Sequence, residues 1–267
     1  MASPEHNLDP VLDKDGVRLT VDDAVATVTL TNPAKRNAQS PALWRALTEA
    51  GRLLPGSVRV VLLRGEGKSF SAGLDRQAFT PEGIDGEPSF VDLARGSDAE
   101  LDATIAEYQE AFTWWRRNDI LSVAVVQGHA IGAGFQLALA CDLRVVADDV
   151  QFAMRETSLG LVPDLTGTHP LVGLVGYARA LEICVTGRFV GAEEAVQTGL
   201  ANLAVPLDQL DAAVQDLTSA LLAAPRDAVV ETKTLLRGAL ERTYEQQRVA
   251  EREAQARRLR DLAGIGE

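Results

Sequence analysis

Segments with the apolar spacing of strands and segments with the apolar spacing of helices follow one another along this chain. Apolar and polar residues alternate over 17–21 and 24–30, which predicts the two strands of a hairpin. Continuous apolar runs predict further, buried strands at residues 58–63, 122–127, 143–147 and 150–153. Buried strands separated by helical segments are typical of an α/β protein.

Helical spacing fills the intervals between these strands. Ser40-Pro41 places an N-cap residue before a proline suited to the first helical position. Asp98 is predicted to cap a helix whose apolar face extends to Trp115. Residues 132–140 are predicted to form a short apolar helix.

The chain divides into a core and a helical end. Residues 1–206 are expected to form the core, whose polar residues 1–16 are predicted to be disordered. Within the core, the Gly- and Pro-rich residues 79–96 are predicted to form a long loop. Residues 207–267 are predicted to be helical, with one apolar stripe formed by Leu207, Leu210, Val214, Leu217 and Leu221.

Charge and cysteine content narrow the class of protein. There are 26 Lys and Arg against 38 Asp and Glu, and this net charge of −12 argues against nucleic acid and anionic membranes as partners. Cys141 and Cys184 lie in apolar segments and are predicted to be buried free thiols. No signal peptide is visible, and the most apolar stretch, residues 131–141, is too short to span a membrane, so we expect a cytoplasmic protein.

A glycine-rich turn carries the first chemical signal. The segment Gly128-His-Ala-Ile-Gly-Ala-Gly-Phe-Gln136 places this turn at the start of the apolar helix. The free N–H groups and the dipole of a helix start favour negative charge, and small residues leave the backbone open to a ligand. Such a turn is also an ordinary packing and capping device. Its meaning therefore depends on the residues around it.

A second turn and two carboxylates complete the pattern. Phe70-Ser-Ala-Gly-Leu-Asp75 follows the buried strand 58–63, and Glu156 and Asp164 follow the helix. The N–H of Leu74 is expected to lie opposite the N–H of Ala133, so that both can bind one oxygen. A nearby carboxylate can then move a proton while the amides hold the charge that develops. A lone carboxylate is more often a solvated charge, but the combination predicts an enzyme that stabilises an enolate.

Several other chemistries lack their motifs. The sequence has no Gly-x-Gly-x-x-Gly, P-loop, His-Glu-x-x-His or Gly-x-Ser-x-Gly pattern. His6, His129 and His169 are isolated from cysteines and carboxylates at metal-ligand spacing, so no metal site is expected. His129 borders the glycine turn, where a packing or capping role is favoured over ligand contact.

The motifs resemble the crotonase (enoyl-CoA hydratase/isomerase) superfamily. The resemblance is carried by residues 32–38, 70–75, 128–142, 152–168 and 186–200, in the order of that family. It implies an α/β fold, a right-handed spiral of ββα units followed by a helical C-terminal part. It also implies a homotrimer or a dimer of trimers, in which residues 207–267 serve oligomerisation and cover the pocket.

The resemblance also implies a ligand and its contacts. The substrate would be an acyl-CoA thioester of fatty acid metabolism, with no tightly bound cofactor, and Leu74 and Ala133 would be the oxyanion donors. The residues carried over as coenzyme A contacts are Lys35, Arg36, Ala38, Ala72, Leu74, Asp75, Arg76 and Gln77. Lys35 and Arg36 also suit a solvated turn.

The chain departs from the family pattern at a position that decides the reaction. Hydratases of the family typically carry a Glu where this chain has Gln136, which cannot accept a proton from water. Glu156 with Asp164 favours double-bond isomerisation of an enoyl-CoA. One alternative is a hydratase in which Asp164 replaces the missing Glu, and another is an acyl-CoA-binding protein without turnover. Arg155 would weaken Glu156 as a base if the two paired, since a cation lowers the pKa of a carboxylate.

Overall fold

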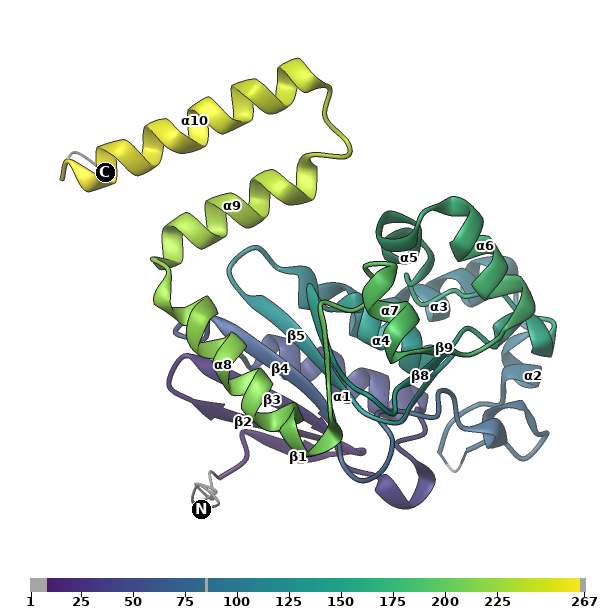
Figure 1. Cartoon of the computed structure of the whole chain (residues 1–267). Coiled ribbons are helices and arrows are strands. Elements are labelled where there is room, and N and C mark those ends of the chain that lie inside the picture. Colours follow the sequence, from purple (N-terminus) through teal and green to yellow (C-terminus); the bar gives the residue numbers. More distant parts are fainter. Residues whose placement is uncertain (1–8, 85, 265–267) are drawn as a thin grey trace.

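A seven-stranded sheet forms the centre of the molecule (Figure 1). The computed structural model describes residues 9–84 and 86–264. The strands pair antiparallel from β1 to β3 and parallel from β3 onward. In spatial order they are β1 (Leu12–Lys14), β2 (Val17–Asp22), β3 (Val25–Leu30), β4 (Val60–Gly65), β5 (Leu121–Val126), β7 (Leu143–Ala147) and β10 (Leu203–Val205).

A smaller sheet is formed by strands that follow β5 and β7 along the chain. It contains β6 (His129–Ile131), β8 (Gln151–Ala153) and β9 (Val190–Gly191). The N–H of Ser71 donates to the carbonyl of His129 at 2.9 Å, and the N–H of Ile131 donates to the carbonyl of Ser71 at 3.0 Å. These bonds connect β6 with the segment that follows β4. The turn at residues 70–75 therefore lies beside the glycine-rich turn at residues 128–134.

Helices cover both faces of the large sheet. Their bounds are α1 (Pro41–Arg52), α2 (Phe90–Leu93), α3 (Asp98–Thr113), α4 (Ala133–Ala140), α5 (Thr168–Val175), α6 (Tyr177–Thr186), α7 (Ala192–Gln197), α8 (Leu210–Ala223), α9 (Arg226–Gly238) and α10 (Tyr244–Leu262). The larger apolar core contains buried residues of α1, α3 and α4, and every residue of α4 is buried. On the other face, Leu210 and Val214 of α8 pack in a second cluster with Val60, Val123 and Val145. The α/β class expected from the sequence is confirmed.

Several sequence predictions need correction. Residues 12–14, expected to be disordered, pair with β2, while residues 1–8 lie outside the described residues. The cap of α3 is Ser97, because its hydroxyl accepts from the N–H of Glu100 in a capping box. The predicted loop 79–96 contains α2. Cys184 is only half-buried.

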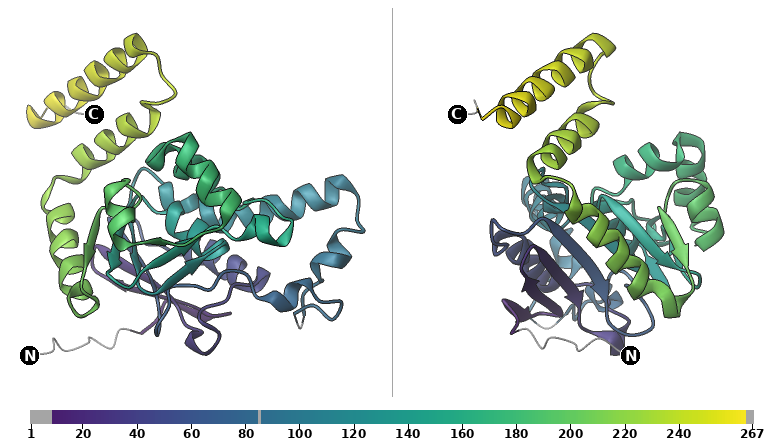
Figure 2. Two further views of the ribbon diagram at one scale, coloured as in Figure 1. Left: turned by 45° about the vertical axis from the view of Figure 1, so that its right-hand side comes forward. Right: turned by 60° about the vertical axis from the view of Figure 1, so that its left-hand side comes forward.

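The C-terminal helices separate progressively from the body. Helix α8 lies along the sheet, whereas α9 and α10 project away from it in every view (Figures 1 and 2). The predicted apolar stripe is present from Leu210 onward, but Leu207 is exposed in a 3-10 turn. Among the helices that the structure describes, none is long and apolar enough to cross a membrane.

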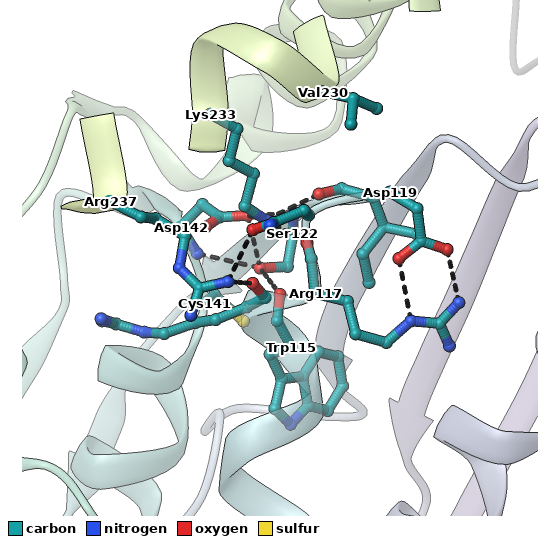
Figure 3. A network of polar contacts seen from close by, with 12 residues as sticks. Trp115, Arg117, Asp119, Ser122, Cys141, Asp142, Val230, Lys233 and Arg237 are labelled. Carbon is teal, nitrogen blue, oxygen red and sulfur yellow. Dashed lines mark hydrogen bonds and ion pairs between the residues drawn. The ribbon is translucent and has the colours of Figure 1, made fainter. Parts of the chain in front are cut away.

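One buried lysine anchors α9 to the body (Figure 3). Lys233, with an exposed fraction of 7 %, donates to the carbonyls of Arg117 and Ile120, each at 2.7 Å. It also forms an ion pair of 2.6 Å with Asp142, which follows α4. Asp142 in turn accepts from the N–H and hydroxyl of Ser122. The network therefore ties α9 to the start of β5 and to the end of α4.

Candidate active site

A cavity of about 850 Å³ lies beside the junction of the two sheets. One wall is formed by residues 72–74 and 131–133, and another by residues from the stretch 155–165. An apolar wall comes from α1, the segment 79–94 and α3, with the aromatic residues Trp44, Phe79, Phe90 and Tyr108. The cavity thus joins backbone turns, carboxylates and an apolar surface.

Two backbone amides of this cavity have no partner among the residues that the structure describes. Leu74 and Ala133 both line it, and neither N–H donates to any residue in the described part of the chain. Gly73 brings the two turns together: a Cβ on it would lie 2.4 Å from the carbonyl oxygen of Ile131 and 3.6 Å from the nitrogen of Ala133. Gly73 also has φ +83°, which side chains rarely adopt. The glycine is required by close approach and by backbone conformation.

The start of α4 is shaped by the same kind of contact. A Cβ on Gly134 would lie 2.6 Å from the carbonyl oxygen of Ser71, so this glycine lets α4 pack against the neighbouring turn. Gly132 has φ +51°, and a Cβ there would lie 3.3 Å from Oε1 of Glu156. The glycine-rich turn therefore leaves room for the Glu156 carboxylate next to the first residue of the helix.

The other end of α4 is held by two arginines. Arg116 donates to the carbonyls of Leu139 and Ala140, at 2.9 and 3.3 Å. Arg144, which is fully buried, donates to the carbonyl of Cys141 at 2.9 Å. Cations at a helix C-terminus interact favourably with its dipole. They stabilise the helix whose opposite end presents the Ala133 amide.

Gln136 is locked in one orientation. Its carbonyl oxygen accepts from the N–H of Leu165 at 2.9 Å and from the N–H of Gly167 at 3.2 Å. The amide nitrogen must therefore point the other way, and it donates to Oε1 of Glu156 at 2.7 Å. The backbone donors decide which end of the amide is oxygen. Gln136 presents Glu156 with a donor that cannot take up a proton.

Glu156 and Asp164 are the two carboxylates that line the cavity. Burial raises the pKa of Glu156, and the charge of Asp164 acts in the same direction, whereas the hydrogen bond from Gln136 opposes them. Burial also raises the pKa of Asp164. Oε2 of Glu156 is buried and has no hydrogen-bond partner among the described residues. Glu156 therefore holds one hydrogen-bonded oxygen and one buried oxygen whose capacity to accept is unused.

Arg155 does not pair with Glu156. Its guanidinium carbon lies 4.9 Å from the ring centroid of Phe189, a cation–π contact. No ion pair joins it to a carboxylate in the described part of the chain. The weakening of Glu156 by an adjacent cation is therefore not observed.

The predicted coenzyme A contacts fall into two groups. Arg36, Ala72, Leu74 and Arg76 line the cavity. The others do not: Lys35 donates to Asp75 at 2.9 Å and to Gln77 at 3.2 Å, while the N–H of Ala38 donates to the carbonyl of Lys35. Lys35 is thus occupied by a surface ion pair.

Sequence reasoning missed several residues around the cavity. Asn37, buried and with φ +53°, donates to the carbonyls of Glu66, Ser69 and Phe70 and so holds the turn that leads to Leu74. In the sequence, only its place in the motif 32–38 pointed to this role. No sequence pattern indicated the aromatic residues of the apolar wall. None of the described residues beyond Phe189 lines the cavity, and cover of the pocket by residues 207–267 stays a prediction.

The structure is that of an α/β protein whose cavity contains two carboxylates and two backbone amides without partners among the described residues. Residues 20–261 match the family Enoyl-CoA hydratase/isomerase, which is most of the chain. The chain belongs to this family, the crotonase superfamily, as its motifs indicated. It is an enzyme of that superfamily.

Individual relatives differ in their reactions. A Thermobifida fusca YX protein, proposed to be an enoyl-CoA hydratase and solved with acetoacetyl-CoA, is 50 % identical with a TM-score of 0.88, over 92 % of this chain and 95 % of that one. Hydroxycinnamoyl-CoA hydratase-lyase of Pseudomonas fluorescens is 30 % identical over 77 % of this chain and 72 % of its own length. 4-Chlorobenzoyl coenzyme A dehalogenase-2 of Arthrobacter sp is 34 % identical over 76 % of this chain and 71 % of its own length.

Proposed function

We propose that this protein binds an acyl-CoA thioester in the cavity and stabilises its enolate with the N–H groups of Leu74 and Ala133. The unpartnered state of both amides, on adjoining turns of one wall, supports this role. The Thermobifida fusca relative solved with acetoacetyl-CoA supports the ligand class. No tightly bound cofactor enters the proposal.

Coenzyme A would enter beside the two turns. Arg36 and Arg76 line the cavity near Leu74 and provide cations for phosphate groups. The apolar wall suits the acyl chain, because it removes hydrocarbon from water without leaving polar groups unpaired. Thr104, Ser158 and Asp164 are among the few polar residues of the lining away from the glycine turns.

The favoured reaction is double-bond isomerisation of an enoyl-CoA. Glu156 takes a proton from the carbon between the thioester carbonyl and the double bond, and the electron pair moves to the carbonyl oxygen. The two amides hold that charge, an effect worth roughly 2.7–4 kcal/mol for one donor in a well-studied enzyme. When the pair returns, the double bond moves toward the carbonyl and a proton is delivered to the far carbon. Substrate and product have the same mass.

The hydrogen bond from Gln136 to Glu156 carries the preference for isomerisation. Water addition benefits from two carboxylates that hold and deprotonate one water, but here the second position is an amide whose oxygen already accepts two backbone bonds. A single carboxylate with one free oxygen suits transfer between two carbons of one substrate.

Hydration is the second candidate function. Asp164 lines the same cavity as Glu156, and burial raises its pKa, so it can serve as the missing second acid–base group. The experiment is incubation with 2-enoyl-, 3-enoyl- and dienoyl-CoA esters, read by mass and by proton NMR. Hydration adds one water, whereas isomerisation moves the vinyl signals at constant mass. Tight binding without any turnover would favour an acyl-CoA-binding protein.

A homotrimer or a dimer of trimers is part of the proposal. The C-terminal helices expose large apolar side chains, a surface that a monomer in water would disfavour: Leu236, Leu240, Tyr244, Leu259 and Leu262. Light scattering coupled to size exclusion would measure the mass. A cytoplasmic location and a role in fatty acid metabolism stay predictions.

A further inference from the structure

Arg155 is fixed in the cavity wall without using its hydrogen-bond donors. Its guanidinium stacks on Phe189 at 4.9 Å from the ring centroid. Gly187, at φ +59°, makes room for the arm of this arginine, since a Cβ there would lie 3.3 Å from Cδ of Arg155. A cation–π contact does not use up the hydrogen-bonding capacity of the guanidinium N–H groups.

Among residues 9–84 and 86–264, the Arg155 guanidinium has no anionic partner. Its N–H groups donate to no atom of the described residues, although acidic residues outnumber basic ones in the sequence, 38 to 26. Arg188, adjacent to Phe189, gives the contrast: it donates to Glu182 at 2.5 and 2.8 Å and to Glu194 at 2.7 and 2.6 Å. Arg188 is thus paired with two carboxylates, whereas Arg155, which lines the cavity, is paired with none among the described residues.

The polar groups near Arg155 are His129, Ser158 and Glu156. His129 also lines the cavity, and its ring lies 6.2 Å from that of Phe189 in an edge-to-face arrangement. The hydroxyl of Ser158 is already used, because it donates to the carbonyl of Arg155 at 2.6 Å. Glu156, the neighbouring carboxylate, is directed toward Gln136. The guanidinium therefore faces the cavity as an unneutralised cation.

We propose that Arg155, supported by Phe189, is an anion subsite of this cavity that binds a phosphate or carboxylate group of the ligand. The planar fork of an arginine matches both groups through two parallel hydrogen bonds. This inference rests on the proposed function, because an acyl-CoA offers these anions in two places. The phosphates belong to the coenzyme, and a carboxylate would end a dicarboxylic acyl chain.

The subsite is distinct from the cations already assigned to coenzyme A. Arg36 and Arg76 flank the turn at Leu74, whereas Arg155 follows β8 and stacks on the residue before β9. The two groups come from different segments of the fold. An Arg155 variant should therefore alter the contribution of one anion and leave the others in place.

Calorimetry with four ligands tests the subsite. The affinities of R155Q and R155K are compared with that of wild type. R179Q is the control, because it removes an equal charge from an exposed site on α6 outside the cavity. The ligands are CoA, 3′-dephospho-CoA, butyryl-CoA and succinyl-CoA; the last two differ by a methyl group against a carboxylate. We expect R155Q to weaken at least one ligand about ten-fold or more, since hydrogen bonds to charged groups are strong. R179Q should bind all four as wild type does.

The pattern of loss identifies the anion. Loss for CoA but not for 3′-dephospho-CoA indicates the 3′-phosphate, equal loss for all four indicates the pyrophosphate, and loss confined to succinyl-CoA indicates an acyl carboxylate. R155K should recover part of the affinity. If wild type binds these ligands and R155Q binds each within two-fold of it, the subsite is refuted while the proposed function stands. If wild type binds none of them, both proposals fail.

Discussion

Gln136 and Glu156 share a hydrogen bond of 2.7 Å that joins α4 to the 3-10 turn at residues 156–159. Because two backbone amides hold the oxygen of Gln136, its nitrogen faces Glu156 in this structure. One carboxylate oxygen is then bound by a donor, and the other is a buried acceptor without a partner among the described residues. The proposed one-carboxylate chemistry depends on this pair.

Q136E tests that dependence. A glutamate in this place would put two carboxyl oxygens at the spacing of the present hydrogen bond, so the pair would share a proton and titrate together. We expect hydration of a 2-enoyl-CoA to rise relative to isomerisation, measured as the ratio of hydrated to isomerised product by mass. Q136M, which has no donor and no charge, is the matched control. An unchanged ratio in Q136E would contradict the role given to Gln136.

The raised pKa values of Glu156 and Asp164 predict how stability depends on pH. A carboxyl whose pKa is raised in the folded state binds its proton more tightly there than in the unfolded chain. It therefore favours folding below the usual pKa of a carboxyl and costs stability as the pH rises through the raised value. We expect E156Q to melt at a higher temperature than wild type at pH 8, and D164N to show a smaller shift in the same direction because Asp164 is exposed to solvent. The difference should vanish near pH 4.

Thermal melts across that pH range provide the measurement. E253Q changes an exposed carboxylate of α10 outside the cavity and serves as the control. Its melting temperature should follow that of wild type throughout. A lower melting temperature for E156Q at pH 8 would show that the charged carboxylate stabilises the fold, against this prediction.

Gly73 should not tolerate a side chain. In G73A the new Cβ would meet the carbonyl oxygen of Ile131, at 2.4 Å, and the backbone would keep an unfavourable positive φ. Gly160 is a matched control, because it has φ +75° in the left-handed region and open space around its Cβ position. G160A carries only the backbone cost, about 1–2 kcal/mol. We expect G73A to lose clearly more stability in urea and most of its activity; equal losses in the two variants would disprove the close-approach argument.

The Lys233 network should be a main anchor of the C-terminal helices. K233M leaves Asp142 as a largely buried, unpaired carboxylate and removes donors from two carbonyls. Breaking a buried pair in this way costs roughly 3–5 kcal/mol. K14M breaks the exposed pair of Lys14 with Glu49 and should cost about 0–1 kcal/mol. Urea unfolding of both variants measures these losses. Similar unfolding midpoints for K233M and K14M would contradict the anchoring role of the Lys233 network.

The sequence predicted the parts of the fold with strong local signals. The apolar runs became β4, β5 and β7, and the Ser40-Pro41 start of α1 was confirmed with the Ser40 hydroxyl as cap. The strands β6, β9 and β10 were missed, because two or three residues are too few to establish a period. The short β1 was missed for the same reason, within a polar segment.

The site was predictable as a set of residues but not as a geometry. Leu74, Ala133, Gln136, Glu156 and Asp164 all followed from motifs, and the structure brings them to one region. The bond between Gln136 and Glu156 spans 20 positions and depends on how α4 packs, so no spacing rule could supply it. The contact of Arg155 with Phe189 likewise joins the segment after β8 to the residue before β9.

Exchange of the substrate's acidic proton tests the central claim most directly. Wild type and E156Q are incubated in D₂O with a 3-enoyl-CoA, and deuterium at the carbon next to the carbonyl is followed by NMR. We predict exchange with isomerisation in wild type. In E156Q the rate should fall by about two to four orders of magnitude, the size of a general-base effect, while the dissociation constant of the ester is kept. Exchange in E156Q at the wild-type rate would contradict the account.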